Sequence, residues 1–289
     1  MKIIIRSFAD NIFQYIWKSS AIVVLLCLFV FPGVYGEEKT EDQNRALKTN
    51  TNIVADTKNM QLISAGSFQM GSMGGDMDEQ PIRKIYVDVF FIDRYETSVI
   101  EYQTCVDVGK CNIADTSDTV PKENEPVAGI SFDDASAYCE YRGKRLPTEA
   151  EWEKAATWKN NTKYKYPLAD VTENCEDSSI FKVKTYFIDA EGCGNEPLKK
   201  VFSGSTEING TLHMSGNVWE WVSDIYGQYD EEKTAGNIDD NPLRVIRGGA
   251  CWHNQELPQR GAFRNFINSS VKAHVLGVRC AYTPPADPS

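Results

Sequence analysis

Four short stretches, in a fixed order over residues 143–280, constrain the fold of this chain more than any other feature. Each combines glycine or proline with large side chains, and irregular segments rich in Gly, Asn, Asp and Pro lie between them. Long irregular segments are uncommon in a compact domain unless disulfides or metal ions hold the loops. We therefore expect a loop-rich domain held by such restraints. The stretches are Gly143-Lys-Arg-Leu-Pro-Thr-Glu-Ala-Glu-Trp-Glu153, Met214-Ser-Gly-Asn-Val-Trp-Glu-Trp221, Arg247-Gly-Gly-Ala-Cys251 and Leu276-Gly-Val-Arg-Cys280.

Local signals predict a strand and three helices ahead of the irregular region. The segment 84–93 is partly alternating and partly continuously apolar, as in a strand buried on one or both faces. Each helix is expected to begin at a serine or threonine that is followed three residues later by an acidic residue, which forms a capping box. Glycines are the expected stops of the first two helices. The boxes are Ser98–Glu101, Ser131–Asp134 and Thr148–Glu151, and the stops are Gly109 and Gly143.

Preceded by Gly66-Ser-Phe-Gln-Met-Gly71, the four stretches resemble the sulfatase-modifying factor family, whose best-known member is the copper-dependent formylglycine-generating enzyme. The resemblance extends over roughly residues 60–282. It implies an α+β single domain with the loop-rich sulfatase-modifying factor fold, which is an elaborated C-type lectin-like fold. We place this domain at residues 60–284 and a short tail at 285–289.

The amino terminus is typical of an export signal. Basic residues come first, an apolar run from Ala21 to Phe31 follows, and a small residue, Gly36, stands at the expected cut. The run is too short to cross a bilayer, and this order indicates a secretory signal that is cleaved. We predict a signal peptide over 1–36 and a flexible polar linker over 37–59. The protein is then periplasmic or secreted, and an uncleaved membrane anchor is the alternative.

Net charge limits the classes of partner. The formal net charge is −11 at pH 7. Binding to nucleic acid or to an anionic membrane surface requires clustered Lys and Arg. We therefore expect no nucleic-acid partner, and membrane contact only if the signal segment stays uncleaved. A peptide or protein in the cell envelope is the partner that we expect.

Cysteine spacing predicts disulfides, because export places thiols where disulfides persist. The pair Cys105–Cys111 flanks a short loop after the first helix, and Cys175–Cys193 flanks an irregular loop, so we expect both to be bonded. The family resemblance implies a third bond, Cys139–Cys280. Cys251 is then left over, as a buried inert thiol or as a reactive one.

The segment that would hold copper departs from the family pattern. The family's oxidase binds copper(I) through two thiolates a few residues apart after Gly-Gly-Ser, since soft sulfur ligands select this ion. Here the segment reads Gly248-Gly-Ala-Cys-Trp-His-Asn254, with Ala250 at the serine position and one cysteine. We therefore do not expect a two-thiolate copper site. A site built from Cys251 and His253 is the remaining candidate for catalysis.

Calcium is the metal that the resemblance favours. Family members hold it with backbone carbonyls and a Glu around Gly-Asn-x-Trp-Glu, an all-oxygen set that suits this ion. Here the carbonyls of Gly216 and Val218 and the carboxylate of Glu220 match, whereas His213 replaces an Asn or Asp and is a poor calcium ligand. At this site and at a second one, the alternative is that the same groups only cap loops. The second site would use Asn174, the carbonyl of Cys175 and residues near Asn195.

Three further residues match the family's substrate groove: Trp219, Trp221 and Arg264. Tryptophans that alternate with a charged residue are more often core than contact, so we expect only Trp219 to be partly exposed. Arg264 could bind a carboxylate or a peptide carbonyl, and a structural salt bridge is an equal alternative. The three histidines show no metal-type spacing, and neither a nucleophile elbow nor a phosphate loop occurs.

Two functions remain open from the sequence. The first is a binding or scaffold module in the cell envelope, which holds a peptide or protein near Trp219 and Arg264 and lacks formylglycine-generating activity. The second is a metal-dependent oxidase of the same family that acts on a protein or a small thiol-bearing substrate. Loss of the thiolate pair favours the first, and whether the protein is an enzyme is left undecided.

Overall fold

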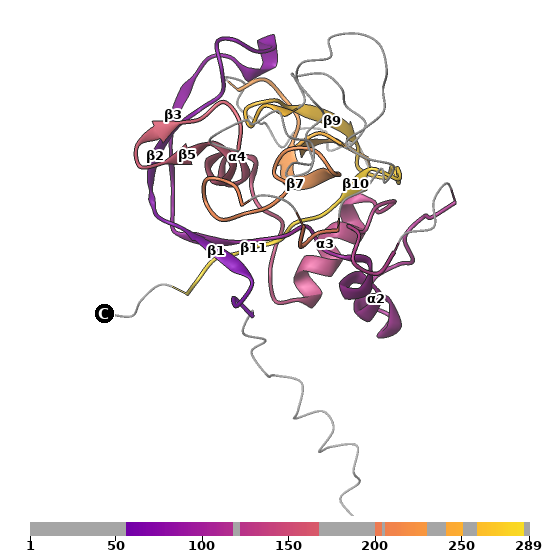
Figure 1. Cartoon of the computed structure of the whole chain (residues 1–289). Coiled ribbons are helices and arrows are strands. Elements are labelled where there is room, and N and C mark those ends of the chain that lie inside the picture. The colour runs from indigo at the N-terminus through magenta and orange to yellow at the C-terminus, as the bar shows by residue number, and fades with distance from the viewer. Residues whose placement is uncertain are drawn as a thin grey trace, which may run out of the picture. The chain divides into compact units, whose positions relative to one another are not determined.

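Four small sheets and three α-helices make up the part of the chain that a computed structural model describes, residues 56–117, 122–167, 200–203, 206–229, 241–250 and 259–285 (Figure 1). Most of the strand pairs are antiparallel, and the helices lie among the strands. Long connections without regular structure join these elements. The architecture confirms the predicted α+β, loop-rich class.

The strands form two larger sheets and two ribbons. One sheet has the order β1-β4-β11 and the other the order β10-β7-β8-β9, in which β10 pairs with β7 in parallel. In the first sheet the strands are β1 (Met60–Ile63), β4 (Phe90–Asp93) and β11 (Ala281–Tyr282). In the second they are β7 (Trp219–Ile225), β8 (Leu243–Arg247), β9 (Asn265–Asn268) and β10 (Leu276–Gly277). The ribbons pair β2 (Gly66–Met70) with β3 (Arg83–Val87), and β5 (Trp158–Lys159) with β6 (Thr162–Lys163).

All three helices begin at the predicted capping boxes. In each one the Ser or Thr side chain accepts from the backbone N–H three residues on, and the acidic side chain there accepts from the cap's own N–H. Gly109 and Gly143 follow the first two helices with positive φ, as expected of helix stops. The helices are α2 (Val99–Asp107), α3 (Phe132–Tyr141) and α4 (Glu149–Thr157), and a 3-10 turn, η1 (Met77–Glu79), lies between β2 and β3.

The single strand predicted over 84–93 is two strands in the structure. β3 pairs with β2, whereas β4 lies between β1 and β11, so the chain changes sheets at Asp88 and Val89. The point where the segment changes from alternating to continuously apolar corresponds to this break. β3 alternates between exposed and partly buried residues, and β4 has Phe90 and Ile92 fully inside.

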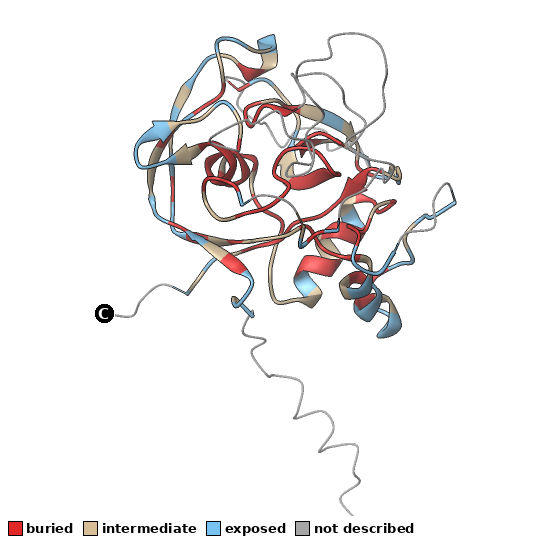
Figure 2. Ribbon diagram, viewed as in Figure 1, coloured by how far each residue is buried: buried red, intermediate tan, exposed pale blue. Residues whose placement is uncertain are grey.

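Helix α4 lies in the middle of the domain and is buried on nearly every side (Figure 2). Trp152, Ala155 and Ala156 are 0% exposed, and the helix packs against β2, β7 and β8. Its charged residues are buried with it: Glu149, Glu151, Glu153 and Lys154. Burial of a charge is costly unless the charge is paired, so α4 needs oppositely charged or polar partners within the protein.

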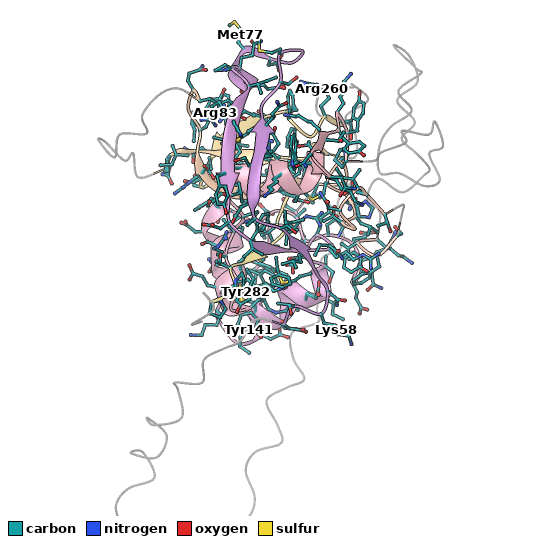
Figure 3. All side chains as sticks on the ribbon, turned by 90° about the vertical axis from the view of Figure 1, so that its left-hand side faces the viewer. Lys58, Met77, Arg83, Tyr141, Arg260 and Tyr282 are labelled. Carbon is teal, nitrogen blue, oxygen red and sulfur yellow. A yellow bond between two sulfur atoms is a disulfide. The ribbon has the colours of Figure 1, made fainter. Side chains whose placement is uncertain are left out.

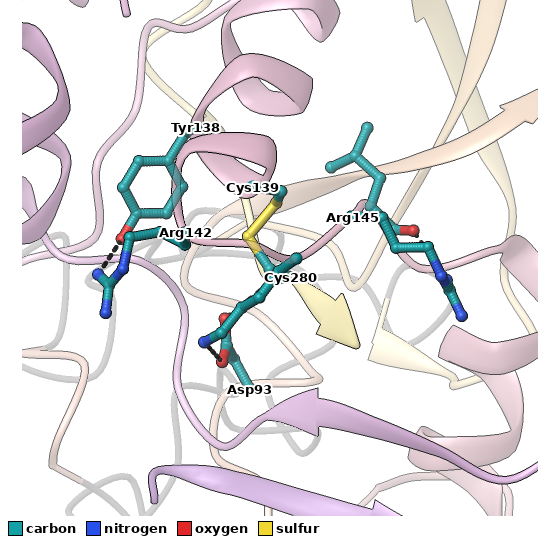
Figure 4. Close-up of a disulfide and its surroundings, with 8 residues drawn as sticks. Asp93, Tyr138, Cys139, Arg142, Arg145 and Cys280 are labelled. Carbon is teal, nitrogen blue, oxygen red and sulfur yellow. Dashed lines mark hydrogen bonds and ion pairs between the residues drawn. A yellow bond between two sulfur atoms is a disulfide. The ribbon is translucent and has the colours of Figure 1, made fainter. Parts of the chain in front are cut away.

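Two of the three expected disulfides are present among the described residues. Cys105–Cys111 closes the loop at the end of α2, and Cys139–Cys280 joins α3 to the residue before β11 (Figure 4). The pair Cys175–Cys193 lies outside the described residues. The long-range bond therefore fastens the carboxyl-terminal strand of the domain to a helix that forms far earlier in the chain.

The predicted signal peptide, 1–36, and most of the linker, 37–59, also lie outside the described residues. The first strand among the described residues begins at Met60. Within the described part of the chain, none of the helices combines the length and the apolar character that crossing a bilayer would require.

We predict that Cys139→Ala costs more stability than Cys105→Ala. The two bonds span 141 and 6 residues, and loop-entropy arithmetic gives about 5 and about 2 kcal/mol for loops of these lengths. Urea unfolding of the two variants and the parent protein would measure this. Equal losses, or a larger loss for Cys105→Ala, would show that loop closure does not govern the contribution of these bonds.

Candidate functional site

The loop that leads into β7 carries two of the predicted calcium ligands, Gly216 and Val218, and is buried from Thr211 onward. His213, Gly216 and Asn217 have positive φ, of 61°, 83° and 63°. Gly and Asn adopt this conformation more readily than most residues. The N–H of Gly216 donates to the carbonyl of Gly248 at 2.7 Å, and the amide of Asn217 donates to Glu96 Oε2. These bonds fix the loop against β8 and against the segment after β4.

Glu220 of β7 is at the centre of the first buried ion-pair network. The Nε and Nη2 of Arg279 donate to its two carboxylate oxygens at 2.8 to 3.1 Å. The indole Nε1 of Trp152 donates to Glu220 Oε2 at 2.7 Å. All three side chains are 0% exposed. The carboxylate is therefore neutralised and satisfied by groups of the protein itself.

These contacts do not fit the predicted calcium site at Gly216, Val218 and Glu220. Each Glu220 oxygen already accepts two hydrogen bonds, so a calcium ion bound there would have to displace the guanidinium of Arg279. The second predicted site, at Asn174 and Cys175, lies outside the described residues and stays a prediction.

Two further buried carboxyl groups surround Arg279. Burial raises the pKa of Glu207 to about 7, and Arg279 acts in the opposite direction. Burial, and then the charge of Glu220, hold the pKa of Glu96 well above its usual range. Glu207 accepts from the N–H of Met214 and from the hydroxyl of Thr211. Arg279 thus faces three carboxyl groups. The raised pKa values of Glu96 and Glu207 favour their neutral forms, which lowers the electrostatic cost of burying three acids beside one cation.

The prediction that Trp219 is partly exposed is wrong. Its side chain is 4% exposed and packs in the core, with its ring centroid 6.1 Å from that of Phe263. In the parallel pairing with β10, Leu276 stands opposite Trp219, and both residues belong to the same buried hydrophobic cluster. Trp221 is core, as predicted, and its Nε1 donates to the carbonyl of Ile130 at 3.0 Å.

Arg264, the other residue predicted to line the groove, is 3% exposed and belongs to a second network. Its Nε donates to Glu149 Oε1 at 2.6 Å, its Nη2 to Glu149 Oε2, and its Nη1 to the carbonyl of Asp78. Each of the three guanidinium nitrogens donates to a group of the protein. The structural salt bridge, and not a groove contact, is therefore the role that the structure gives to Arg264.

Sequence reasoning missed the rest of this second network. Arg247 of β8 is 0% exposed and donates to Glu153 Oε2 at 2.7 Å and to the carbonyls of Gly261 and Phe263. Arg260 forms a bidentate ion pair with Glu79 of η1. The signal in the sequence was weak: Glu149 and Glu153 are four residues apart and so share one face of α4 with the apolar side chains.

The weak catalytic candidates Cys251 and His253 lie outside the described residues. The four cysteines that the described ranges contain are all in disulfides. Figure 3 shows that Arg83 and Arg260 lie toward the end of the domain that carries Met77, and Lys58 and Tyr141 lie at the other end. Arg264 contacts the same end through its bond to the carbonyl of Asp78, the residue after Met77.

Comparison with known families gives a match over most of the chain. The sequence model of the sulfatase-modifying factor enzyme 1-like domain matches residues 45–284. The formylglycine-generating enzyme of Streptomyces coelicolor is 31% identical over 172 residues, which cover 57% of this chain and 55% of that enzyme.

A second relative bears a different name. The serine/threonine-protein kinase pkn1 of Chlamydia pneumoniae is 31% identical over 248 residues, which cover 77% of this chain and 37% of that protein. The chain spans about two fifths of the length of the pkn1 proteins that it matches. The whole-protein activity of these relatives therefore does not transfer directly to this chain.

Among solved structures, PvdO from Pseudomonas aeruginosa superposes with a TM-score of 0.59 at 22% sequence identity. The match covers 77% of this chain and 93% of PvdO. At this level of identity the likeness concerns the fold alone.

We predict that Arg279→Met lowers the free energy of unfolding by about 3 to 5 kcal/mol, because it leaves the Glu220 charge buried without a cation. The double variant Arg279→Met with Glu220→Gln removes that charge and should recover a large part of the loss. Urea unfolding of the single and double variants tests this. A double variant that is less stable than the single one would contradict it.

We predict that Glu207→Gln changes the pH dependence of stability. A carboxyl whose pKa is higher in the folded protein stabilises it fully below the unfolded pKa and loses this effect as the pH rises through the folded pKa. For Glu207 this window runs from its usual 4.5 to about 7. Between these limits the stability of the variant relative to the parent should rise by ~3 kcal/mol.

Thermal or urea unfolding at a series of pH values measures this difference. The exposed Glu140 of α3 offers a control, because Glu140→Gln removes a carboxylate that is in contact with solvent. A constant difference between Glu207→Gln and the parent across the window would refute the prediction.

Proposed function

Because this chain belongs to the sulfatase-modifying factor family, we propose that it is an exported member that keeps the fold as a peptide- or protein-binding module in the cell envelope and lacks formylglycine-generating activity. The observation that carries the proposal is the Cys139–Cys280 disulfide. It removes Cys280, the one cysteine that follows Cys251 in the sequence, from any copper site.

The Cys139–Cys280 disulfide matters because a copper(I) site of the family type requires free thiolates. The family resemblance implies two thiolates at the copper site, and soft sulfur ligands select this ion. Cys251 supplies one thiol, and the cysteines of the described residues are all bonded to one another. The remaining candidates, Cys175 and Cys193, are expected to pair with each other. A copper centre of the family type therefore has no evident second ligand.

The two buried ion-pair networks also support a scaffold role, because their charged groups are used within the fold. Trp219 and Arg264 are inside the domain, so the partner surface predicted near them is not carried into the proposal. Two disulfides in the described residues, together with the signal-like amino terminus, support export to an oxidising compartment. We propose the periplasm or the extracellular space as the location.

The second candidate function is a metal-dependent oxidase that acts on a protein or a small thiol-bearing substrate. The similarity to the Streptomyces coelicolor formylglycine-generating enzyme favours it. Its metal would bind at Cys251 and His253, two ligands that need further donors. The kinase name of the pkn1 relatives finds no support in this chain, which has no glycine-rich phosphate-binding loop.

Copper(I) titration followed by a cysteine-peptide oxidation assay separates the two functions. We expect neither stoichiometric copper binding nor turnover, and we expect the parent protein and Cys251→Ala to behave alike. Stoichiometric binding with turnover, both lost in Cys251→Ala, would overturn the binding-module proposal in favour of the oxidase.

A further inference from the structure

The turn between β2 and β3, residues 71–82, carries two methionines that are largely open to solvent. Met73 is 63% exposed and Met77 is 85% exposed, and Figure 3 shows Met77 at one end of the domain. The other methionines among the described residues are buried: Met60, Met70 and Met214 are 7%, 2% and 0% exposed. The fold thus divides its methionines into an exposed pair, Met73 and Met77, and a protected group.

The backbone that carries the exposed pair is held by the rest of the domain. The N–H of Gly71 donates to Glu153 Oε1 at 2.7 Å, and the N–H of Ser72 donates to the carbonyl of Glu79 at 3.0 Å. Glu79 is 0% exposed and is held in turn by its bidentate ion pair with Arg260. A Cβ added to Gly71 would overlap the carbonyl of Glu79, so the close approach of these segments requires glycine. The exposure of the two methionines is therefore a property of the folded domain and needs no opening of the turn.

A thioether in this position has no steric protection from small oxidants. Hydroperoxides convert methionine to its sulfoxide, and the reaction needs only access to the sulfur. The sulfur lone pair attacks an oxygen of the hydroperoxide, and the O–O bond breaks as the S–O bond forms. The hydroperoxide's proton moves to the departing oxygen. Sulfur is thus oxidised by two electrons, and the hydroperoxide is reduced to water or to an alcohol.

The place of the two side chains decides what their oxidation does to the fold. A sulfoxide is polar, and it disrupts a core or an interface in which methionine is packed. Met73 and Met77 project into solvent, so a sulfoxide there stays hydrated and leaves the core intact. At Met70 and Met214 the same change would place a polar group in the core cluster that contains both residues.

We propose that Met73 and Met77 are the sites at which hydroperoxides modify the folded protein, and that this modification changes its surface without opening its core. The proposed export gives the setting, because an exported protein lies outside the reducing pool of the cytosol. Methionine sulfoxide reductases, one for each sulfoxide epimer, reverse the change, and exposed side chains are within their reach. The modification goes beyond the proposed binding function and does not depend on it.

Site-resolved oxidation kinetics test the proposal. The folded protein is treated with hydrogen peroxide, the reaction is stopped at intervals, and each methionine is followed by peptide mass spectrometry. We expect Met73 and Met77 to form sulfoxides at least about tenfold faster than Met70 and Met214, because a buried thioether reacts only after the structure opens. Equal rates at the exposed and the buried methionines of the folded protein would overturn the proposal.

Oxidation in concentrated urea is the control for intrinsic reactivity. In the unfolded chain the same four methionines should react at similar rates, since burial no longer separates them. A rate difference that persists in urea would show that the local sequence, and not the fold, selects the exposed pair.

Leucine variants locate the modification, because leucine keeps the volume of methionine and lacks the thioether. The double variant Met73→Leu with Met77→Leu should gain no methionine sulfoxide over the period in which both sites of the parent protein are oxidised. Met60→Leu is the matched control: it removes a buried methionine and should leave oxidation of the exposed pair unchanged. Sulfoxide formation in the double variant at the rate of the parent protein would overturn the assignment.

The effect on the fold is measured on the oxidised protein. Once both exposed thioethers are sulfoxides, the midpoint of urea unfolding should equal that of the untreated protein. Reductases for the two epimers should then restore the original mass without unfolding. A lowered midpoint, or sulfoxides that the reductases reach only in urea, would contradict a modification that is confined to the surface.

Discussion

The guanidinium of Arg279 connects segments that are far apart in the sequence, and the described part of the domain depends on it. It donates to the carboxylate of Glu220 on β7, to the carbonyl of Asp93 on β4 and to the carbonyl of Leu212. The next residue, Cys280, is bonded to α3. A cation that is fully buried must be matched by acceptors on every side, so the positions of these four segments are coupled to one another.

A second set of buried charges is coupled to the first through one side chain. Trp152 donates its indole N–H to Glu220, and the guanidinium of Arg247 lies 5.2 Å over its ring. Arg247 in turn is held by Glu153 on the same helix. Helix α4 thus carries acidic residues of one network and an aromatic residue, Trp152, that contacts both networks. In the sequence these residues belong to a family motif, but in the structure their role is to pair the buried charges around the central helix.

This arrangement explains which features the sequence could predict. Capping boxes are local, so the first residue of each helix followed from side chains three positions apart. The Cys139–Cys280 bond followed from the family resemblance. Arg247 and Arg264 could not be assigned, because their acidic partners are about a hundred residues earlier in the chain. Trp219 was misjudged because its strand pairs with β10, more than fifty residues later in the chain, and packs in a core cluster with it. Local sequence patterns do not predict such a distant partner.

The balance of charge shows that both buried networks are structural. Around Glu149, Glu153 and Arg247, each charged head group meets an opposite one at hydrogen-bond distance, so a ligand would gain little there and would have to break existing pairs. Glu96 is buried beside Glu220 and Arg279, and burial holds its pKa well above the usual range. The fold therefore lowers the cost of an acid that lacks a direct ion pair by favouring its neutral form.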